Sequence, residues 1–316
     1  MHIVLRYHFT DEQVAAFRQL ADDMGGHQIT HIPNRENIEN PPDTEVILGH
    51  FNPAVCATAP SLKWIQSFSA GMDSMLFPDL IESDVIVTNM AGHYAVQGAE
   101  QAWALLLALC RGIDLSVEAK LRNEWQGGRG IVLTGGTLGV IGAGGFGQEI
   151  VTRAAGYDMS VVAIDPIRRD PPPGFDELSE ASTANLHALL ERSDAVMLAC
   201  PRTVETYHLI GAEELRRMKS SAYLINVTRG GIVDEVALVQ ALESGEIAGA
   251  GLDVTEREPL PAESPLFGAP NLILTGHSAG RSQYREQVVF EFFTDNLKRY
   301  LKGDPLNNVV DKTRGF

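Results

Sequence analysis

The sequence is poor in basic residues compared with acidic ones. Its 25 lysines and arginines stand against 41 aspartates and glutamates, which gives a formal net charge of −16. Binding to the phosphate backbone of DNA or RNA needs clusters of positive charge, and an anionic membrane surface attracts the same residues. The charge balance therefore predicts no nucleic-acid partner and no membrane partner.

Cysteine is also scarce. Cys56, Cys110 and Cys200 are widely spaced and form no CxxC pair. An odd number of scattered cysteines is typical of a reducing compartment and provides no disulfide framework. The opening residues MHIVLRYHF reach Arg6 and His8 too soon for a secretory signal. These features predict a cytoplasmic protein.

Three further patterns are missing. The longest apolar run, AWALLLALC at 102–110, is far shorter than a membrane span, which needs about 20 residues. No cluster of histidine, cysteine and carboxylate residues has the spacing of metal ligands, so no metal site is expected. No nucleophile–base signature of a hydrolase is assigned: the spacing G-x-S-x-G occurs only in GHSAG at 276–280, the segment that carries His277, so covalent hydrolysis is not expected.

What the sequence does have is a repeated alternation of short apolar strands and helices. At 316 residues the chain exceeds the usual size of one core. The alternation occurs before residue 90 and again after residue 130, which predicts two doubly wound α/β domains, Rossmann-like or flavodoxin-like, with parallel sheets and a cleft between them. A helix is expected at 97–122, apolar on nearly every face and therefore buried. The final helix, 282–303, is long enough to return to the first domain.

A glycine-rich segment, TLGVIGAGGFGQEI, follows an apolar strand and begins a helix. Gly142, Gly144 and Gly147 have the G-x-G-x-x-G spacing that allows a tight turn, close approach of a pyrophosphate and close helix packing. The next strand, VVAID, ends on Asp165, where an acid that binds the adenosine ribose is expected. Together these features predict a dinucleotide site, and Asp165 favours NAD over NADP.

Three side chains suited to carbonyl chemistry stand at the ends of later strands. LINVTRGG places Arg229, GLDVTEREPLP places Glu258, and LILTGHSAG places His277. A histidine titrates near about 6.5, and a neighbouring carboxylate favours its protonated form. Arginine can make a forked contact with a 2-oxo acid. Reduction of a carbonyl by hydride needs such a proton donor, carboxylate and cation.

These motifs resemble the D-isomer-specific 2-hydroxyacid dehydrogenases along nearly the whole chain, most densely at 200–235 and 249–280. The resemblance implies an NAD-dependent enzyme in which His277 is the proton donor, Glu258 its partner and Arg229 the substrate anchor. It also implies a homodimer, the usual assembly of family members. It also implies that residues 1–96 and 280–316 form the substrate-binding domain and residues 97–279 the dinucleotide-binding domain.

Further contacts follow from the same resemblance. In FSAGMDSM, the backbone N–H groups of Ala70 and Gly71 would bind the substrate carboxylate, together with Arg229 and His277. Asp253 would hold the nicotinamide carboxamide. The other expected cofactor contacts are Gly145, Phe146, Cys200, Pro201 and Thr228.

Two positions depart from the family pattern. Gly276 stands where proline commonly precedes the histidine, and Gln101 where histidine often follows the helix glutamate. Neither change removes a group needed for the reaction. We expect reduction of a small 2-oxo acid, as in glyoxylate or hydroxypyruvate reductases and phosphoglycerate dehydrogenases.

Two alternatives remain open. One is an NAD-sensing binding module like the corepressors of this fold, which can retain the same three residues; the acidic charge favours an enzyme. The other is a formate or phosphite dehydrogenase. In formate dehydrogenases the expected partner of the histidine is glutamine, so Glu258 argues against that activity.

Overall fold

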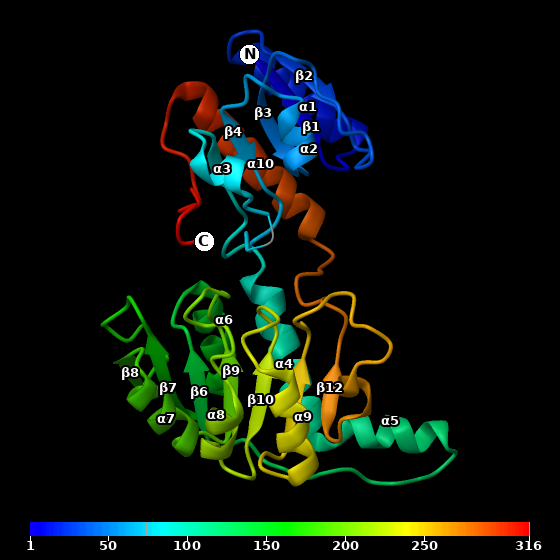
Figure 1. Cartoon of the computed structure of the whole chain (residues 1–316), viewed down its shortest axis with the longest axis vertical. Helices are drawn as coiled ribbons and strands as arrows, with labels where there is room; N and C mark the ends of the chain where they lie inside the picture. Colours follow the sequence, from blue (N-terminus) through cyan, green and yellow to red (C-terminus); the bar gives the residue numbers. More distant parts are fainter. Residues whose placement is uncertain (74, 316) are drawn as a thin grey trace. The chain divides into compact units, whose positions relative to one another are not determined.

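The computed structural model describes residues 1–73 and 75–315 and divides into two compact units. Unit 1 comprises Met1–His93 and Ser282–Phe316, and unit 2 is the continuous segment Tyr94–Arg281. Each unit holds one sheet with helices, and every strand ladder is parallel (Figure 1). The predicted α/β class with two parallel sheets is confirmed. The predicted boundaries lie within a few residues of this division.

Unit 1 contains a five-stranded sheet in the order β2-β1-β3-β4-β5. Its strands are β1 (His2–Arg6), β2 (Gln28–His31), β3 (Thr44–Gly49), β4 (Trp64–Gln66) and β5 (Ile86–Thr88). Its helices are α1 (Asp11–Asp23), α2 (Pro53–Ala57), α3 (Pro78–Glu82) and α10 (Arg285–Lys302). As predicted, Thr10 caps α1, in a capping box with Gln13.

A buried polar network attaches α10 to the sheet of unit 1. Asn296 is fully buried, and its Nδ2 donates to Oε1 of Gln66 on β4 at 2.8 Å. Gln66 Oε1 also accepts from the Thr88 hydroxyl at 2.7 Å, and this hydroxyl accepts from the Trp64 indole at 2.9 Å. Because each buried polar group has a partner, the helix is fixed to this sheet without an orphaned donor.

Unit 2 contains a seven-stranded sheet in the order β12-β11-β10-β9-β6-β7-β8. Its strands are β6 (Thr137–Ile141), β7 (Ser160–Asp165), β8 (Glu177–Glu180), β9 (Ala195–Leu198), β10 (Tyr223–Asn226), β11 (Gly249–Leu252) and β12 (Leu272–Leu274). Its helices are α4 (Ala95–Arg111), α5 (Ile113–Leu121), α6 (Gly145–Ala154), α7 (Thr183–Arg192), α8 (Ala212–Arg217) and α9 (Glu235–Ser244), with 3₁₀ turns η1 (Ala155–Tyr157) and η2 (Pro265–Gly268).

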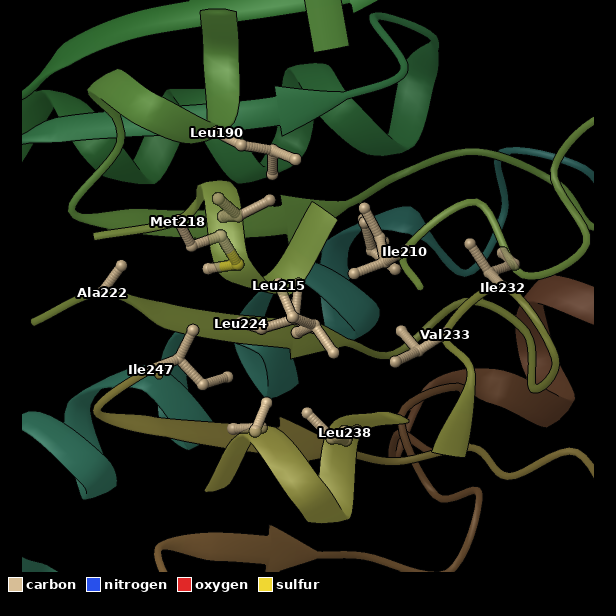
Figure 2. Packing of buried hydrophobic residues seen from close by; sticks show 14 of the residues in the cluster. Leu190, Ile210, Leu215, Met218, Ala222, Leu224, Ile232, Val233, Leu238 and Ile247 are labelled. Carbon is tan, nitrogen blue, oxygen red and sulfur yellow. The ribbon is translucent and has the colours of Figure 1, made fainter. Parts of the chain in front are cut away.

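The sheet of unit 2 is covered on both faces. Helices α4 and α6 pack together on one face, and α7, α8 and α9 cover the other. Successive strand residues alternate between the two cores: Val140 packs with the α4 side and Ile141 with the α7 side. Figure 2 shows Leu215 and Leu238 turned toward Leu224 of β10 in the second core. Burial on both faces explains the nearly continuous apolar strands.

The single helix predicted at 97–122 is wrong. Gly112 adopts a left-handed conformation with φ 62° and separates α4 from α5. An added Cβ there would meet the backbone of Gly128 and Arg129 at 2.2–2.7 Å, so only glycine fits the close approach. The expected burial holds for α4 but not for most of α5, where Ile113, Val117 and Leu121 are exposed. Within the described residues, no helix is long and apolar enough to cross a membrane.

Candidate active site

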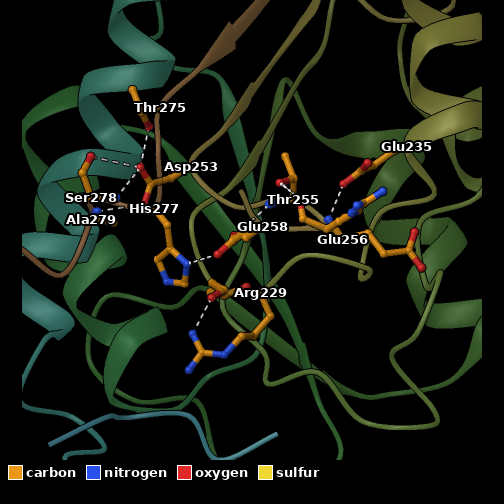
Figure 3. Close-up of polar contacts among 12 residues, drawn as sticks. Arg229, Glu235, Asp253, Thr255, Glu256, Glu258, Thr275, His277, Ser278 and Ala279 are labelled. Carbon is orange, nitrogen blue, oxygen red and sulfur yellow. Dashed lines mark hydrogen bonds and ion pairs between the residues drawn. The ribbon is translucent and has the colours of Figure 1, made fainter. Parts of the chain in front are cut away.

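The carboxyl ends of three neighbouring strands bring the expected chemical groups to one edge of the unit 2 sheet. Arg229 lies in the turn after β10, Glu258 in the loop after β11, and His277 just beyond β12. Figure 3 shows the three side chains grouped at this edge. The order β12-β11-β10 in the sheet therefore joins residues that are well separated in the sequence.

His277 and Glu258 form a direct pair. Nδ1 of His277 lies 2.6 Å from Oε2 of Glu258, while Oε1 of Glu258 accepts the backbone N–H of Thr255 at 3.1 Å. Glu258 is thus held from both sides and can receive the Nδ1 proton of the ring. The pair uses Nδ1, so Nε2 at the opposite side of the imidazole is the atom that can serve a reacting molecule.

The backbone at His277 is left-handed, with φ 47°. Few residues other than glycine adopt this region, and each such residue carries a cost of about 1–3 kcal/mol that its surroundings must offset. The strand was predicted to end just before His277, and the structure agrees; the left-handed turn was not predicted. What offsets the strain is the set of hydrogen bonds to Asp253.

Asp253 is buried, with 1% of its surface exposed, and it holds the segment that carries His277. Its Oδ1 accepts from the Thr275 hydroxyl at 2.5 Å and from the Ser278 N–H at 3.0 Å. Its Oδ2 accepts from the Ala279 N–H at 2.7 Å, and its carbonyl oxygen accepts from the His277 N–H at 2.7 Å. In the structure, the Asp253 carboxylate holds the segment 275–279, which carries His277. Contact with a nicotinamide carboxamide stays a prediction.

Gln101 extends this arrangement to helix α4. Its Nε2 donates to the Thr275 hydroxyl at 3.0 Å, and that hydroxyl donates to Asp253. Sequence reasoning noted Gln101 only as a departure from a family pattern and missed both the link and Thr275. The only available signal was the polar Thr275 at the end of an apolar strand.

Asn226 organises the turn that carries Arg229. This buried side chain accepts the N–H and the hydroxyl of Thr228 at 3.0 and 2.9 Å, and its Nδ2 donates to the Arg229 carbonyl at 2.8 Å. Arg229 itself donates through Nη1 to the Thr228 carbonyl at 2.7 Å. Asn226 was not singled out from the sequence, although an asparagine at the end of a buried strand is a signal for such a turn.

The glycine after Arg229 allows two loops to touch. A Cβ on Gly230 would lie 1.8 Å from the Thr255 carbonyl oxygen, so any larger residue would clash unless the backbone moved. The turn of Arg229 therefore packs backbone to backbone on the loop of Glu258. This contact fixes the cation relative to the His277–Glu258 pair.

The glycine-rich loop has the geometry of an anion cradle. Gly142 has φ 107°, and a Cβ on Gly147 would lie 2.1 Å from the Gly142 carbonyl oxygen. Gly144 and Gly145 would meet nothing within 4 Å, so the space beyond the turn is open. Helix α6 begins at Gly145 and its N-cap, Gly144, provides no side-chain hydrogen bond. The first N–H groups of α6 can therefore bind a pyrophosphate.

Asp165 lies at the end of β7 beside this cradle. Its Oδ1 accepts the N–H groups of Ile167 and Arg168, both at 2.8 Å, and its Oδ2 accepts the Ala143 N–H at 2.9 Å. Partial burial opposes ionisation, but the three N–H donors outweigh it and lower the pKa of this carboxyl. Oδ1 is saturated, and one lone pair of Oδ2 remains for a ribose hydroxyl.

The other expected cofactor contacts differ in character. Burial raises the pKa of the Cys200 thiol to about 12, so this side chain is a neutral part of the core. The Phe146 ring approaches Gly98 of α4, so a contact from Phe146 to a dinucleotide would come from its backbone. Pro201 is exposed, and its carbonyl accepts the Thr206 hydroxyl at 2.7 Å.

The loop with Ala70 and Gly71, predicted to bind the substrate carboxylate, lies in unit 1 after β4. The Ala70 carbonyl accepts Nδ2 of the buried Asn89 at 2.8 Å, which orders the loop before Gly71. Asn89 was not predicted from the sequence. Among the side chains that the structure describes, no group of three or more histidines, cysteines and carboxylates is placed to hold a metal ion.

Comparison with known proteins identifies the family of the chain. Residues 103–279 match the family model for the D-isomer specific 2-hydroxyacid dehydrogenase NAD binding domain. A glyoxylate reductase of Korarchaeum cryptofilum is 37% identical over 264 residues, covering 82% of this chain and 79% of that protein.

Solved structures extend the likeness to the whole chain. A D-isomer specific 2-hydroxyacid dehydrogenase family protein from Aeromonas salmonicida is 30% identical, with a TM-score of 0.83, and covers 98% of this chain and 99% of its own. A D-isomer specific 2-hydroxyacid dehydrogenase from Xanthobacter autotrophicus, solved with NADPH and MES, is 28% identical with a TM-score of 0.83, covering 100% and 99%. The chain therefore belongs to the D-isomer specific 2-hydroxyacid dehydrogenase family and is an oxidoreductase with an NAD-binding domain.

Proposed function

We propose that the protein reduces a small 2-oxo acid to the D-2-hydroxy acid, with His277 as proton donor, Glu258 as its partner and Arg229 as substrate anchor. The observation that carries the proposal is the 2.6 Å pair between His277 and Glu258, next to the Arg229 turn. Substrate binding by the N–H groups of Ala70 and Gly71 belongs to the same proposal.

The roles follow from the chemistry of the side chains. A reduced nicotinamide, when bound, supplies a hydride to C2 of the 2-oxo acid. The oxygen at C2 then gains a proton, which His277 donates from Nε2. Glu258 keeps the Nδ1 proton on the ring and stabilises the charged imidazole before transfer. Arg229 binds the carboxylate and polarises the carbonyl, because its planar donors match two oxygens at once.

NAD is the proposed cofactor. Asp165 can accept a ribose hydroxyl at its remaining Oδ2 lone pair and repels a 2′-phosphate there. Arg169 is engaged by Glu180 at 3.1 Å, which limits its reach toward a phosphate, whereas Arg168 is an exposed cation nearby. The Xanthobacter autotrophicus relative was solved with NADPH, so the choice needs measurement.

Glyoxylate is the first substrate to test, because the Korarchaeum cryptofilum relative bears the name glyoxylate reductase. The test is an assay of glyoxylate, hydroxypyruvate, pyruvate and 3-phosphohydroxypyruvate, each with NADH and with NADPH. The loss of absorbance of the reduced nicotinamide measures turnover. Turnover of at least one acid is expected, and every chiral product should have the D configuration; the glycolate formed from glyoxylate has no stereocentre. No turnover of any 2-oxo acid with either cofactor would contradict the proposal.

A homodimer is proposed for the assembled protein. Ile113, Val117 and Leu121 follow one another at helical spacing on α5 and are 52%, 54% and 79% exposed. The Trp125 side chain just beyond them is fully exposed. An apolar stripe of this kind marks a protein interface, and a second copy of the chain is its simplest self-complementary partner. A cytoplasmic location stays a prediction.

A further inference from the structure

Glu235 stands outside the proposed set of reacting groups but touches the loop that carries one of them. It is the first residue of α9, after the N-cap Asp234. Its Oε1 accepts the backbone N–H of Glu256 at 2.5 Å, and Figure 3 shows it turned toward that residue. Glu256 lies two positions before Glu258 in the same short loop.

The loop has few internal supports of its own. The Thr255 N–H caps Oε1 of Glu258, and the Thr255 hydroxyl donates to the Arg257 carbonyl at 2.9 Å. Both bonds lie within the loop and cannot place it relative to the sheet. Its position must come from contacts with other elements.

Those contacts converge on two residues. Gly230 packs on the Thr255 carbonyl, and the Glu256 side chain accepts from the Tyr207 hydroxyl at 2.5 Å and faces His208 Nε2 at 3.4 Å. The Glu235 carboxylate is the contact that reaches the loop backbone by a charge-assisted hydrogen bond, which is stronger than a neutral one.

The surroundings show that this contact is maintained at a cost. Partial burial raises the pKa of Glu235, and the nearby charges of Glu256 and Glu258 raise it further. The Glu256 N–H favours the ionised form and offsets part of that effect. A third carboxylate beside two others is unfavourable in itself, so its contribution must lie in what it binds.

We propose that Glu235 is a positioning residue for the reaction, which fixes the 255–258 loop and thereby holds Glu258 in contact with His277. The proposal rests on the proposed role of the His277–Glu258 pair. It requires an acceptor oxygen at Glu235; the negative charge strengthens the bond but a neutral acceptor also maintains it. A small shift of Glu258 would break its hydrogen bond with Nδ1 of His277. The glycine-rich loop follows a different strand and would not be affected.

The experiment compares three variants of the whole protein. Glu235→Ala removes the acceptor, Glu235→Gln keeps an acceptor oxygen without charge, and Glu243→Ala removes an exposed carboxylate from the last turn of the same helix. For Glu235→Ala we expect kcat to fall about tenfold or more, since small misplacements of reacting groups carry such costs, with NADH affinity unchanged. Glu235→Gln is expected to stay within about threefold of the wild type in kcat, and Glu243→Ala to equal it.

A second measurement does not depend on turnover. The proton between His277 and Glu258 should give a downfield imidazole N–H resonance, assigned by its loss in His277→Ala. We expect that resonance to be lost or shifted in Glu235→Ala and retained in Glu235→Gln. If Glu235→Ala keeps the resonance and kcat, or if Glu235→Gln fails as Glu235→Ala does, the positioning role is wrong. If the resonances behave as expected but no 2-oxo acid is reduced, the proposed function alone fails.

Discussion

Nδ1 of His277 lies 2.6 Å from Oε2 of Glu258, across two loops that leave neighbouring parallel strands. Each partner is held by its own carboxylate: Asp253 binds the N–H groups of Ser278 and Ala279, and Glu235 binds the N–H of Glu256. The contact therefore depends on backbone anchoring from the sheet as well as on the two side chains. This explains how a half-exposed pair keeps a defined geometry.

Replacing Glu258 with glutamine tests the charge in this pair. The amide oxygen can still accept from Nδ1, but a neutral acceptor forms a weaker bond than a carboxylate. We expect kcat to fall about tenfold, which corresponds to about 1.4 kcal/mol of lost stabilisation. Steady-state kinetics with saturating NADH measure it. Unchanged kcat would show that the carboxylate charge has no part in the reaction.

Arg229→Lys preserves the positive charge and removes the planar fork. The expected result is a higher KM for the 2-oxo acid together with a lower kcat, because carboxylate binding and carbonyl polarisation fail together. NADH affinity, measured by fluorescence, serves as the control and should not change. A variant that melts at a lower temperature but keeps both kinetic constants would make Arg229 structural.

Asp165→Ser tests cofactor choice. One charge-assisted hydrogen bond to the ribose is worth about 1.5–3 kcal/mol, so the wild type should favour NADH by about tenfold or more in kcat/KM, and the variant should lose that preference. The N–H donors lower the pKa of Asp165, so it stays ionised well below neutral pH and the preference should not vary across the neutral range. Equal use of NADPH by the wild type would mean that Arg168 sets the choice.

The cysteines provide a pH-dependent test of burial. Burial raises the pKa of the Cys56 and Cys110 thiols to about 11 and that of Cys200 to about 12. Only the thiolate is alkylated, so a raised pKa means slow reaction at neutral pH and faster reaction only under strongly alkaline conditions. Native protein treated with iodoacetamide should remain unmodified, while unfolded protein should react at all three sites. Rapid native labelling of Cys200 would contradict its place in the core.

The α5 stripe predicts assembly. Introducing glutamates at Val117 and Leu121 places charge in the apolar surface and should shift the protein from dimer to monomer in analytical ultracentrifugation. Glu118→Lys, a charge change at an exposed position on a different face of the same helix, is the matched control and should leave the dimer intact. A wild-type protein that is monomeric at all concentrations would exclude this interface.

Much of the fold could be predicted because its strands are buried on both faces and its helices carry clear ends. Arg229, Glu258 and His277 were expected at the ends of neighbouring strands, and the structure places them together at that edge of the sheet; their roles in the reaction stay a prediction. Two features escaped for a physical reason. Gly112 breaks a continuous apolar helix, and the apolar pattern of the sequence cannot distinguish a helix packed on the core from α5, where Ile113, Val117 and Leu121 are exposed.

Hydrogen bonds between residues far apart in the sequence, and pairing at the sheet edge, could not be predicted from the sequence. The bonds from Thr275, Ser278 and Ala279 to the oxygens of Asp253 were not predicted, and the expected contact of Asp253 with the cofactor stays a prediction. Strand β8 was not predicted, because its residues are mostly polar and it pairs only at the sheet edge. Edge pairing is decided by the neighbouring strand rather than by local composition.

The central claim, that Nε2 of His277 donates the proton, is tested most directly by His277→Ala. Single-turnover oxidation of NADH by a saturating 2-oxo acid should slow by about 10²- to 10⁴-fold, the range for one acid–base group. The dissociation constant of NADH, measured on the same preparation, should stay unchanged. A variant whose single-turnover rate lies within a few-fold of the wild type would contradict the claim and remove His277 from the mechanism.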